Sequence, residues 1–455
     1  MKAPIWVLAL IFGVVHGSAA RADLPLPHFV PLPRYHYTPG EVLEYDGSSV
    51  FAYQNGKFVN TTKEKSWVVA KNPDGSWVLL TRVEMNEHRE ETGAGDFKIP
   101  DETRISWTRA TTFPDGHTSN VEATDGHAMM TATGHTLPAK LDEMRSGWES
   151  KIGDDDVHFT VVPGTARGQI VIHSVTSKPI DAIYLSTGSA DTTFDLNRGL
   201  RVSEVNRYTQ GYGFVGESTG TETLVSTGTE TPERLKQLND EFAAYMAARK
   251  STAGWITPES TPDQIDVGAV AITAALKKAR DDAPDFTDVI DKELAGVKES
   301  VDCEKKAAQA RLDMLHASAA DWKTTDLKGA PHALADYRGQ VVVLDFWYRG
   351  CGWCMLAMPQ VIDAASHFAG RPVTFLAMTT DEPHSKDGDF VVDKMKIPYA
   401  TLYAKDIAAN YKINGFPTLL VLDQKGAVRF IHTGYAKDLR EEIEANVESL
   451  LTQGK

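Results

Sequence analysis

Short apolar runs separated by turn residues dominate the chain between residues 23 and 231. Two of these runs, 157–162 and 200–205, are bounded by Gly, Pro, Asp or Ser. Asn55-Gly56 is the pair that a two-residue type I′ hairpin turn needs, because both of its central residues have positive φ. Many short strands with frequent turns are typical of an antiparallel sandwich or a curved half-barrel. The pattern therefore predicts an all-β region.

The spacing of apolar residues becomes helical between residues 232 and 320. Leu235, Leu238, Phe242 and Met246 recur at intervals of three and four, and a similar stripe follows Pro284 as far as Leu315. Such stripes are usually the core-facing sides of helices. A segment rich in Ser, Thr, Pro and Gly, 251–266, separates the two stripes. We expect a helical connector with a break at that segment.

A buried strand followed by two cysteines is the clearest pattern of the C-terminal region, 321–455. The run 341–344 is continuously apolar and β-branched, as expected for a strand buried on both faces. Cys351-Gly352-Trp353-Cys354 comes shortly after it, and the residues that follow have helical composition. The pattern therefore predicts that Cys351 lies at the N-terminus of a helix.

A cysteine in that position is chemically favoured as a thiolate. The unpaired N–H groups and the positive end of the helix macrodipole lower the pKa of the thiol. Cys354 lies one turn further on, so the two sulfurs can close a disulfide without unfolding the helix. Half of a zinc site and a permanent disulfide are the alternatives. No second Cys pair and no His at zinc-ligand spacing follow Cys354, so redox exchange is favoured.

These residues resemble the thioredoxin superfamily, and the region from about residue 322 onwards resembles its secreted TlpA/ResA-type members. Asp345, six residues before Cys351, matches the buried carboxylate that helps to move the proton of the second cysteine. Phe416-Pro417 resembles the cis-proline loop that lies against the active-site sulfurs. The resemblance implies an α/β thioredoxin fold and a catalytic set of Cys351, Cys354, Asp345 and Pro417.

The resemblance further implies a thiol-disulfide oxidoreductase that acts on client proteins with disulfides or thiols. Trp353 and Phe416 are the suspected substrate contacts. Because no charged residue stands between the cysteines, the reducing direction is favoured over the oxidising one. No metal and no organic cofactor are expected, but a reductase outside the cytoplasm needs electrons from a membrane donor. Peroxide reduction is disfavoured, because Tyr348-Arg349-Gly350 replaces the usual Thr-x-x-Cys pattern.

The first 22 residues change the expected compartment. Lys2 precedes an apolar run, 5–15, and Ala20-Arg21-Ala22 has the small-x-small pattern of a cleavage site. The run is shorter than the roughly 20 residues that span a bilayer, so we expect a cleaved signal peptide and no stable membrane insertion. The protein is therefore predicted to be periplasmic or secreted, with cleavage near Ala22.

Overall composition adds few constraints. The chain has 455 residues, three cysteines and a formal net charge of −15. Without a basic tract, a nucleic-acid partner is excluded. Cys303 lies one step off the apolar stripe and is expected to be an inert, partly buried thiol, although a free thiol in an oxidising compartment could pair between molecules. Four histidines are candidate metal ligands, but their spacing matches no metal site. They are therefore interpreted as solvated loop histidines: His88, His117, His127 and His135.

The sequence therefore predicts four segments: a signal peptide (1–22), a β-rich domain (23–231), a helical connector (232–320) and a thioredoxin-like domain (321–455). Two functions remain open. The first is a secreted thiol-disulfide oxidoreductase that uses Cys351 and Cys354. The alternative is an envelope binding or structural protein, defined by the β-rich domain, in which the thioredoxin-like domain is an accessory module.

Overall fold

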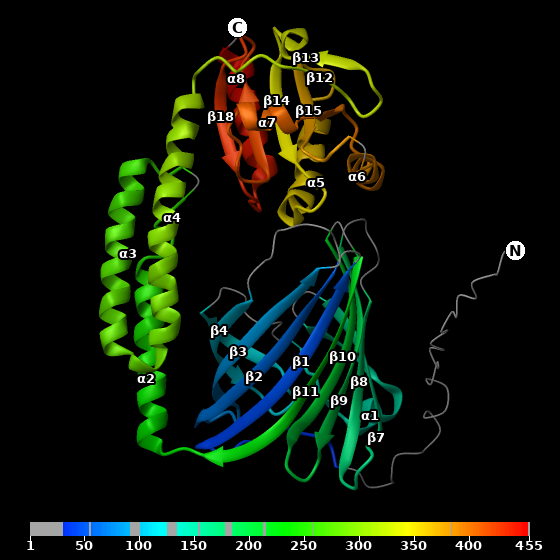
Figure 1. Ribbon diagram of the computed structural model, residues 1–455. Coiled ribbons are helices and arrows are strands. Elements are labelled where there is room, and N and C mark those ends of the chain that lie inside the picture. Colours follow the sequence, from blue (N-terminus) through cyan, green and yellow to red (C-terminus); the bar gives the residue numbers. More distant parts are fainter. Residues whose placement is uncertain are drawn as a thin grey trace, which may run out of the picture.

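The computed structural model describes residues 31–53, 56–91, 101–124, 134–152, 155–177, 184–212, 215–257, 259–383 and 385–453. The signal peptide expected at 1–22, the hairpin residue Asn55 and His127 lie outside these ranges. Within them, every helix is too short or too polar to cross a bilayer. Figure 1 shows three parts: a large curled sheet, an arm of helices beside it, and a smaller α/β region beyond the arm.

The β-rich region is one antiparallel sheet of eleven strands. Strands β1 to β5 pair in sequence order, and so do strands β6 to β11. The two series are joined where β1 pairs with β11, with Glu41 opposite Thr229. The fold class is thus the curved half-barrel of the two predicted forms. The strands are β1 (Glu41–Tyr53), β2 (Gly56–Lys71), β3 (Trp77–Glu91), β4 (Glu102–Thr112), β5 (Thr118–Ala123), β6 (Trp148–Ile152), β7 (Asp155–Pro163), β8 (Gln169–Ser177), β9 (Tyr184–Asp195), β10 (Leu200–Tyr212) and β11 (Val215–Thr229).

The two faces of this sheet have different partners, because successive side chains of a strand point to opposite sides. Val42 packs with the helices, whereas its neighbour Leu43 belongs to a cluster on the other face. On the helix-facing side the rings of Trp67 and Trp107 stack with centroids 5.6 Å apart. The opposite face encloses a cavity lined by residues of β1–β10. Strands so far apart in the sheet order surround one cavity only because the sheet curls.

The helical arm consists of α2 (Pro232–Ser251), α3 (Pro262–Asp282), a 3₁₀ turn (Pro284–Phe286) and α4 (Thr287–Met314). Thr231 and Thr261 cap α2 and α3, and each is followed by Pro at the first helical position. The expected break is real but shorter than 251–266, because the Thr261 cap starts a helix that the apolar spacing did not reveal. Phe286 is fully buried where the helices meet β4.

The C-terminal region is a five-stranded sheet with helices on both faces, as the fold class predicted. Its strand order is β16-β15-β14-β17-β18, with β14 parallel to β15 and antiparallel to β17. The elements are β12 (Lys323–Thr325), β13 (Pro331–Ala333), β14 (Val341–Trp347), α5 (Gly352–His367), β15 (Val373–Thr379), α6 (Asp387–Met395), β16 (Thr401–Tyr403), α7 (Lys405–Asn410), β17 (Thr418–Leu422), β18 (Val428–Thr433) and α8 (Leu439–Gln453).

The central strand β14 explains why this region has two cores. All seven of its residues are buried. Val341 and Val343 pack under α5 and α8, whereas Val342, Leu344 and Phe346 pack on the face covered by α7. The carboxyl end of β14 and the start of α5 point towards the half-barrel (Figure 1).

Candidate active site

Cys351 and Cys354 form a disulfide at the beginning of α5. Their Cα atoms are 5.2 Å apart. Cys351 is the N-cap residue of the helix, and its sulfur accepts a hydrogen bond from the backbone N–H of Cys354 at 3.1 Å. The same N–H would stabilise a Cys351 thiolate in the reduced protein, in addition to the helix dipole.

The chain between β14 and α5 places this disulfide beyond the carboxyl end of the central strand. Cys351 and Cys354 are 6% and 2% exposed, and they pack with Trp347 at the end of β14. Cys351 is slightly more exposed than Cys354, which favours Cys351 as the cysteine that a client reaches. Pro359 lies inside α5, at the position where a helical N–H would otherwise be required.

Asp345 is a buried carboxyl group on β14. It is 3% exposed, and burial raises its pKa to about 7. At that pKa the group is close to half-protonated at neutral pH and can accept or release a proton there. A buried carboxyl group with such a pKa is more useful for proton transfer than for stability.

Tyr399 lies near Asp345, and the sequence analysis did not single it out. Burial, followed by the charge of Asp345, raises the pKa of Tyr399 well above its usual range. The ring packs against the cluster that contains both cysteines, and its buried hydroxyl has no hydrogen-bond partner within the described residues. No sequence motif marks this tyrosine, because it comes from the segment between α6 and β16.

The loop before β17 completes the surroundings of the disulfide. The Phe416–Pro417 peptide bond is cis. Phe416 packs against the cysteine cluster, and its ring meets the edge of Tyr348 with centroids 5.2 Å apart. The carbonyl of Pro417 accepts a hydrogen bond from Gly434, which connects the loop to the end of β18.

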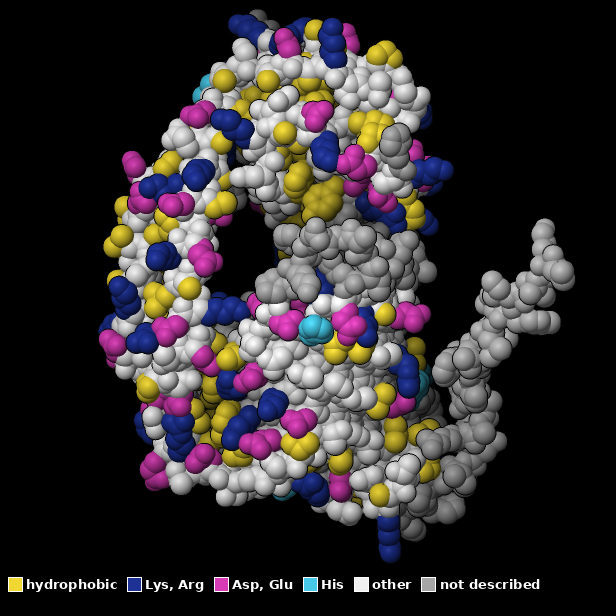
Figure 2. Space-filling view, viewed as in Figure 1, with side chains coloured by type: hydrophobic (Ala, Val, Ile, Leu, Met, Phe, Trp, Pro, Cys, Tyr) yellow, Lys and Arg dark blue, Asp and Glu magenta, His cyan; other side chains and the backbone are white. Residues whose placement is uncertain are grey.

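An aromatic surface surrounds the disulfide. Trp353 is 61% exposed and stacks on Tyr435, with ring centroids 5.8 Å apart. Tyr348 and Leu356 are also exposed. Figure 2 shows hydrophobic side chains gathered at the end of this region that faces the half-barrel. The sequence analysis singled out Trp353 and Phe416 but missed Tyr348 and Tyr435, because the rings meet only in the folded chain.

Arg349 orders the loop that precedes Cys351. Its backbone N–H donates to the carboxylate of Asp381, and its guanidinium pairs with Asp387 and lies 4.2 Å from the Phe390 ring. Burial raises the pKa of Asp381. These contacts hold the turn between β14 and α5 against the loop that follows β15.

The remaining candidates lie elsewhere. Cys303 is exposed on α4, which corrects the expectation of a partly buried thiol: its position one step off the apolar stripe faces solvent. His88 lies on β3 rather than in a loop and pairs with Asp101; His117 and His135 pair with Asp115 and Glu143. Within the described residues, no group of three or more His, Cys, Asp or Glu side chains has the arrangement of a metal site.

Comparisons with known proteins match only the C-terminal region. The model of the AhpC/TSA family matches residues 315–431. The thiol-disulfide oxidoreductase ResA of Geobacillus kaustophilus is 31% identical over 134 residues, which are 29% of this chain and 76% of the relative. The thioredoxin-like protein YneN of Bacillus subtilis is 30% identical over 130 residues, or 28% of this chain and 76% of the relative.

Solved structures resemble the same region. The thioredoxin domain of a thiol-disulfide oxidoreductase from Bacteroides vulgatus is 26% identical, with a TM-score of 0.27; the match covers 29% of this chain and 97% of that domain. A putative thiol:disulfide interchange protein DsbE from Chlorobium tepidum is 22% identical, with a TM-score of 0.29, and the match covers 30% and 97%.

Proposed function

The chain belongs, through its C-terminal region, to the ResA-type thioredoxin-like thiol-disulfide oxidoreductases, and on that premise we propose that it reduces protein disulfides outside the cytoplasm through Cys351 and Cys354. The observation that carries the proposal is the Cys351–Cys354 disulfide at the start of α5, close to a carboxyl group whose pKa is about 7. Thiol-disulfide exchange needs both features, a stabilised thiolate and a proton acceptor.

The proposed reaction has two exchange steps. The Cys351 thiolate attacks one sulfur of a client disulfide, forms a mixed disulfide and displaces the other client sulfur as a thiolate. Cys354 then loses its proton to Asp345 and attacks the Cys351 sulfur, which releases the second client sulfur. The client disulfide gains two electrons, and Cys351 and Cys354 end as the disulfide that the structure contains.

Renewed turnover needs two electrons from another dithiol. In an exported reductase these electrons come from a membrane donor, since the compartment itself is oxidising. We expect client and donor to meet the same surface, because Cys351 is the more exposed of the two cysteines. Pro417, Phe416 and Trp353 would contact the client there. The hydrophobic surface suits an unfolded or extended client segment, whose apolar side chains are accessible.

The decisive experiment traps the mixed disulfide. Cys354→Ser in a Cys303→Ser background leaves one thiol, Cys351, that attacks a client and cannot be displaced from it. We expect covalent client adducts that dithiothreitol releases. The Cys303→Ser/Cys351→Ser/Cys354→Ser variant is the matched control. If the trap captures nothing above this control, the exchange mechanism is wrong.

The direction of transfer is tested by the redox equilibrium with glutathione. We expect a potential more negative than that of the extracytoplasmic pool, which would keep the pair in the role of a reductant. A more positive potential, together with catalysed oxidation of a reduced client, would assign the oxidising direction. N-terminal sequencing of the exported protein tests the predicted cleavage near Ala22.

The alternative function, an envelope binding protein with an accessory redox module, is favoured by one observation: the half-barrel encloses a cavity of about 470 Å³. The two functions differ in what a Cys351→Ser variant loses. If the alternative is right, that variant keeps the cellular phenotype, whereas variants of the cavity lose it.

A further inference from the structure

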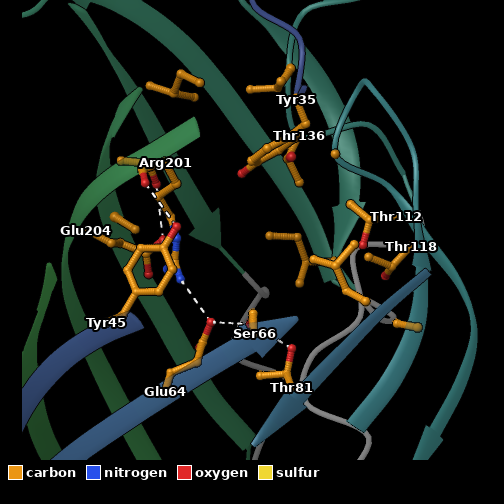
Figure 3. A pocket seen from close by; sticks show the side chains of 18 of the residues that line it. Tyr35, Tyr45, Glu64, Ser66, Thr81, Thr112, Thr118, Thr136, Arg201 and Glu204 are labelled. Atoms are coloured by element: carbon orange, nitrogen blue, oxygen red, sulfur yellow. Dashed lines mark hydrogen bonds and ion pairs between the residues drawn. The ribbon is translucent and has the colours of Figure 1, made fainter. Parts of the chain in front are cut away.

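The cavity of the half-barrel has a mixed lining, in which polar groups lie among apolar side chains such as Leu79 and Phe159. Figure 3 shows hydroxyl, tyrosine and carboxylate side chains turned towards a common space. Its volume of about 470 Å³ lies within the range of small-molecule sites. An apolar ligand would cover these polar groups without satisfying them, which is unfavourable. The hydroxyl-bearing residues of the lining include Ser66, Thr81, Thr108, Thr136, Thr176 and Thr192.

Two segments outside the strands also contribute to the cavity lining. Tyr35 and Tyr37 come from the segment before β1, and Thr136 comes from the segment before α1 (Leu141–Ser146). A Cβ atom at Gly116 would lie 2.0 Å from the Thr136 hydroxyl oxygen and 3.1 Å from the Tyr35 ring. Glycine at this position therefore lets both segments approach the turn between β4 and β5.

Charge in the cavity is unevenly compensated. The lining contains two carboxylates, Glu64 and Glu204, and one guanidinium, Arg201. The closest partner of Arg201 is Glu222, which does not belong to the lining. Glu64 and Glu204 lie 3.9 and 3.7 Å from Arg201, beyond hydrogen-bond distance.

Each lining carboxylate has one further neighbour. Glu64 accepts a hydrogen bond from Ser66 at 3.2 Å, and Glu204 accepts one from Thr192 at 3.1 Å. Hydroxyl groups do not neutralise charge, and Arg201 is already paired with Glu222. The two lining carboxylates therefore leave a surplus of negative charge in a partly enclosed space, where a cation would be stabilised.

The tyrosines give a second, independent indication of a ligand. Tyr37 lines the cavity, its side chain is only 7% exposed, and among the described residues no hydrogen-bond partner of its hydroxyl is found. This hydroxyl is therefore available to a donor or an acceptor inside the cavity. The face of the Tyr45 ring already accepts a cation, because the Arg201 guanidinium lies 4.7 Å from its centroid.

We propose that this cavity binds an aliphatic organic cation through primary ammonium groups that pair with Glu64 and Glu204 and donate to the Tyr37 hydroxyl. An ammonium group supplies three donors and a positive charge, which are what the lining lacks. The cation is either a free polyamine or a lysine side chain of a polypeptide. This site is separate from Cys351 and does not depend on the proposed reductase activity.

Calorimetric titration of the full chain with spermidine tests the site. The Glu64→Gln/Glu204→Gln variant keeps the shape of both side chains and removes their charge, so we expect Kd to rise about tenfold or more. Glu44→Gln is the matched control, because Glu44 lies on β1 but pairs with Lys65, whose side chain is on the opposite face to Glu64. It should leave Kd unchanged. Tetralysine acetylated only at its N-terminus distinguishes the two sources of the ammonium group. Binding of this peptide but not of spermidine would assign the ammonium group to a polypeptide.

The contrary results are equally definite. The proposal is wrong if neither cation binds, if the double variant binds as tightly as the parent chain, or if laurate or maltotriose binds and the two cations do not. If the double variant fails to fold, Tyr37→Phe and Glu204→Gln replace it, and unchanged Kd in both would overturn the site. Client reduction by every cavity variant should equal that of the parent chain. Failure of the cation site and failure of the proposed reductase activity are therefore distinguishable.

Discussion

Both large regions of the molecule contain carboxyl groups that are at least partly buried, but they compensate for them in different ways. In the thioredoxin-like region, Asp345 lies between Ala377 and Leu419 of the neighbouring strands, and burial alone raises its pKa to about 7. In the half-barrel, Glu64, Glu204 and Glu222 surround Arg201. A buried acid without a cation is poised to exchange protons. Three acids around one guanidinium instead leave a surplus of negative charge.

The comparison predicts that activity depends on one region only. Cys351→Ser should lower client reduction by about a thousandfold or more, because it removes the nucleophile. The cavity variant Glu64→Gln/Glu204→Gln should leave the rate unchanged. Insulin reduction by dithiothreitol, followed by turbidity, measures both. A comparable loss in the cavity variant would show that the regions act as one unit.

Loss of the Arg201 charge should lower the stability of the half-barrel. Arg201→Met leaves three carboxylates without their shared cation, which should destabilise the half-barrel by about 3–5 kcal/mol. Hydrogen exchange measured during thermal unfolding reports on strands β1–β11 and on the α/β region separately. The protection of amide hydrogens in the α/β region should not change. Equal loss of protection in both regions would mean that they unfold together.

Asp345→Asn should change how the stability of the thioredoxin-like region depends on pH. A buried acid whose pKa is raised from 3.8 to about 7 binds its proton more tightly in the folded state. Its contribution to stability is therefore complete below about pH 4 and is lost as the pH rises through 7, by roughly 1.4 kcal/mol per pH unit in that window.

The asparagine variant should lack this loss and should be more stable than the parent chain at pH 8, as measured by urea unfolding. The same variant should slow release of the client from the mixed disulfide by about 10–100-fold, because Cys354 loses its proton acceptor. If stability at pH 8 does not rise, the carboxylate is compensated by a group that the structure does not reveal.

Tyr399→Phe should have the smallest effect. Removal of a hydroxyl that lacks a partner costs the fold little. We expect the pH at which client release is half-maximal to shift while the rate at optimal pH changes by no more than about threefold. Tyr403→Phe, which removes an exposed hydroxyl that bonds to Pro383, is the control. Identical pH profiles for Tyr399→Phe and the parent chain would exclude a role for Tyr399 in positioning the Asp345 proton.

Local patterns in the sequence were enough for much of this description. The change from short strands to helical spacing and the buried run before Cys351 each depend on residues close together in the chain. Resemblance to a known superfamily then indicated Asp345 and Phe416-Pro417, which lie far apart in the sequence and which spacing alone would not connect.

The sequence by itself therefore indicated the β-rich region, the helical connector and the α/β region, together with the thiol-disulfide chemistry expected of the C-terminal region. Only the tertiary structure decided the rest: the pairing of β1 with β11, the exposure of Cys303, the position of Tyr399 near Asp345, and the cavity that unites Glu64 with Arg201. The physical reason is sequence separation. Hydrogen-bonding and capping preferences act over a few residues, whereas burial and charge compensation depend on which distant segments the curled sheet brings together.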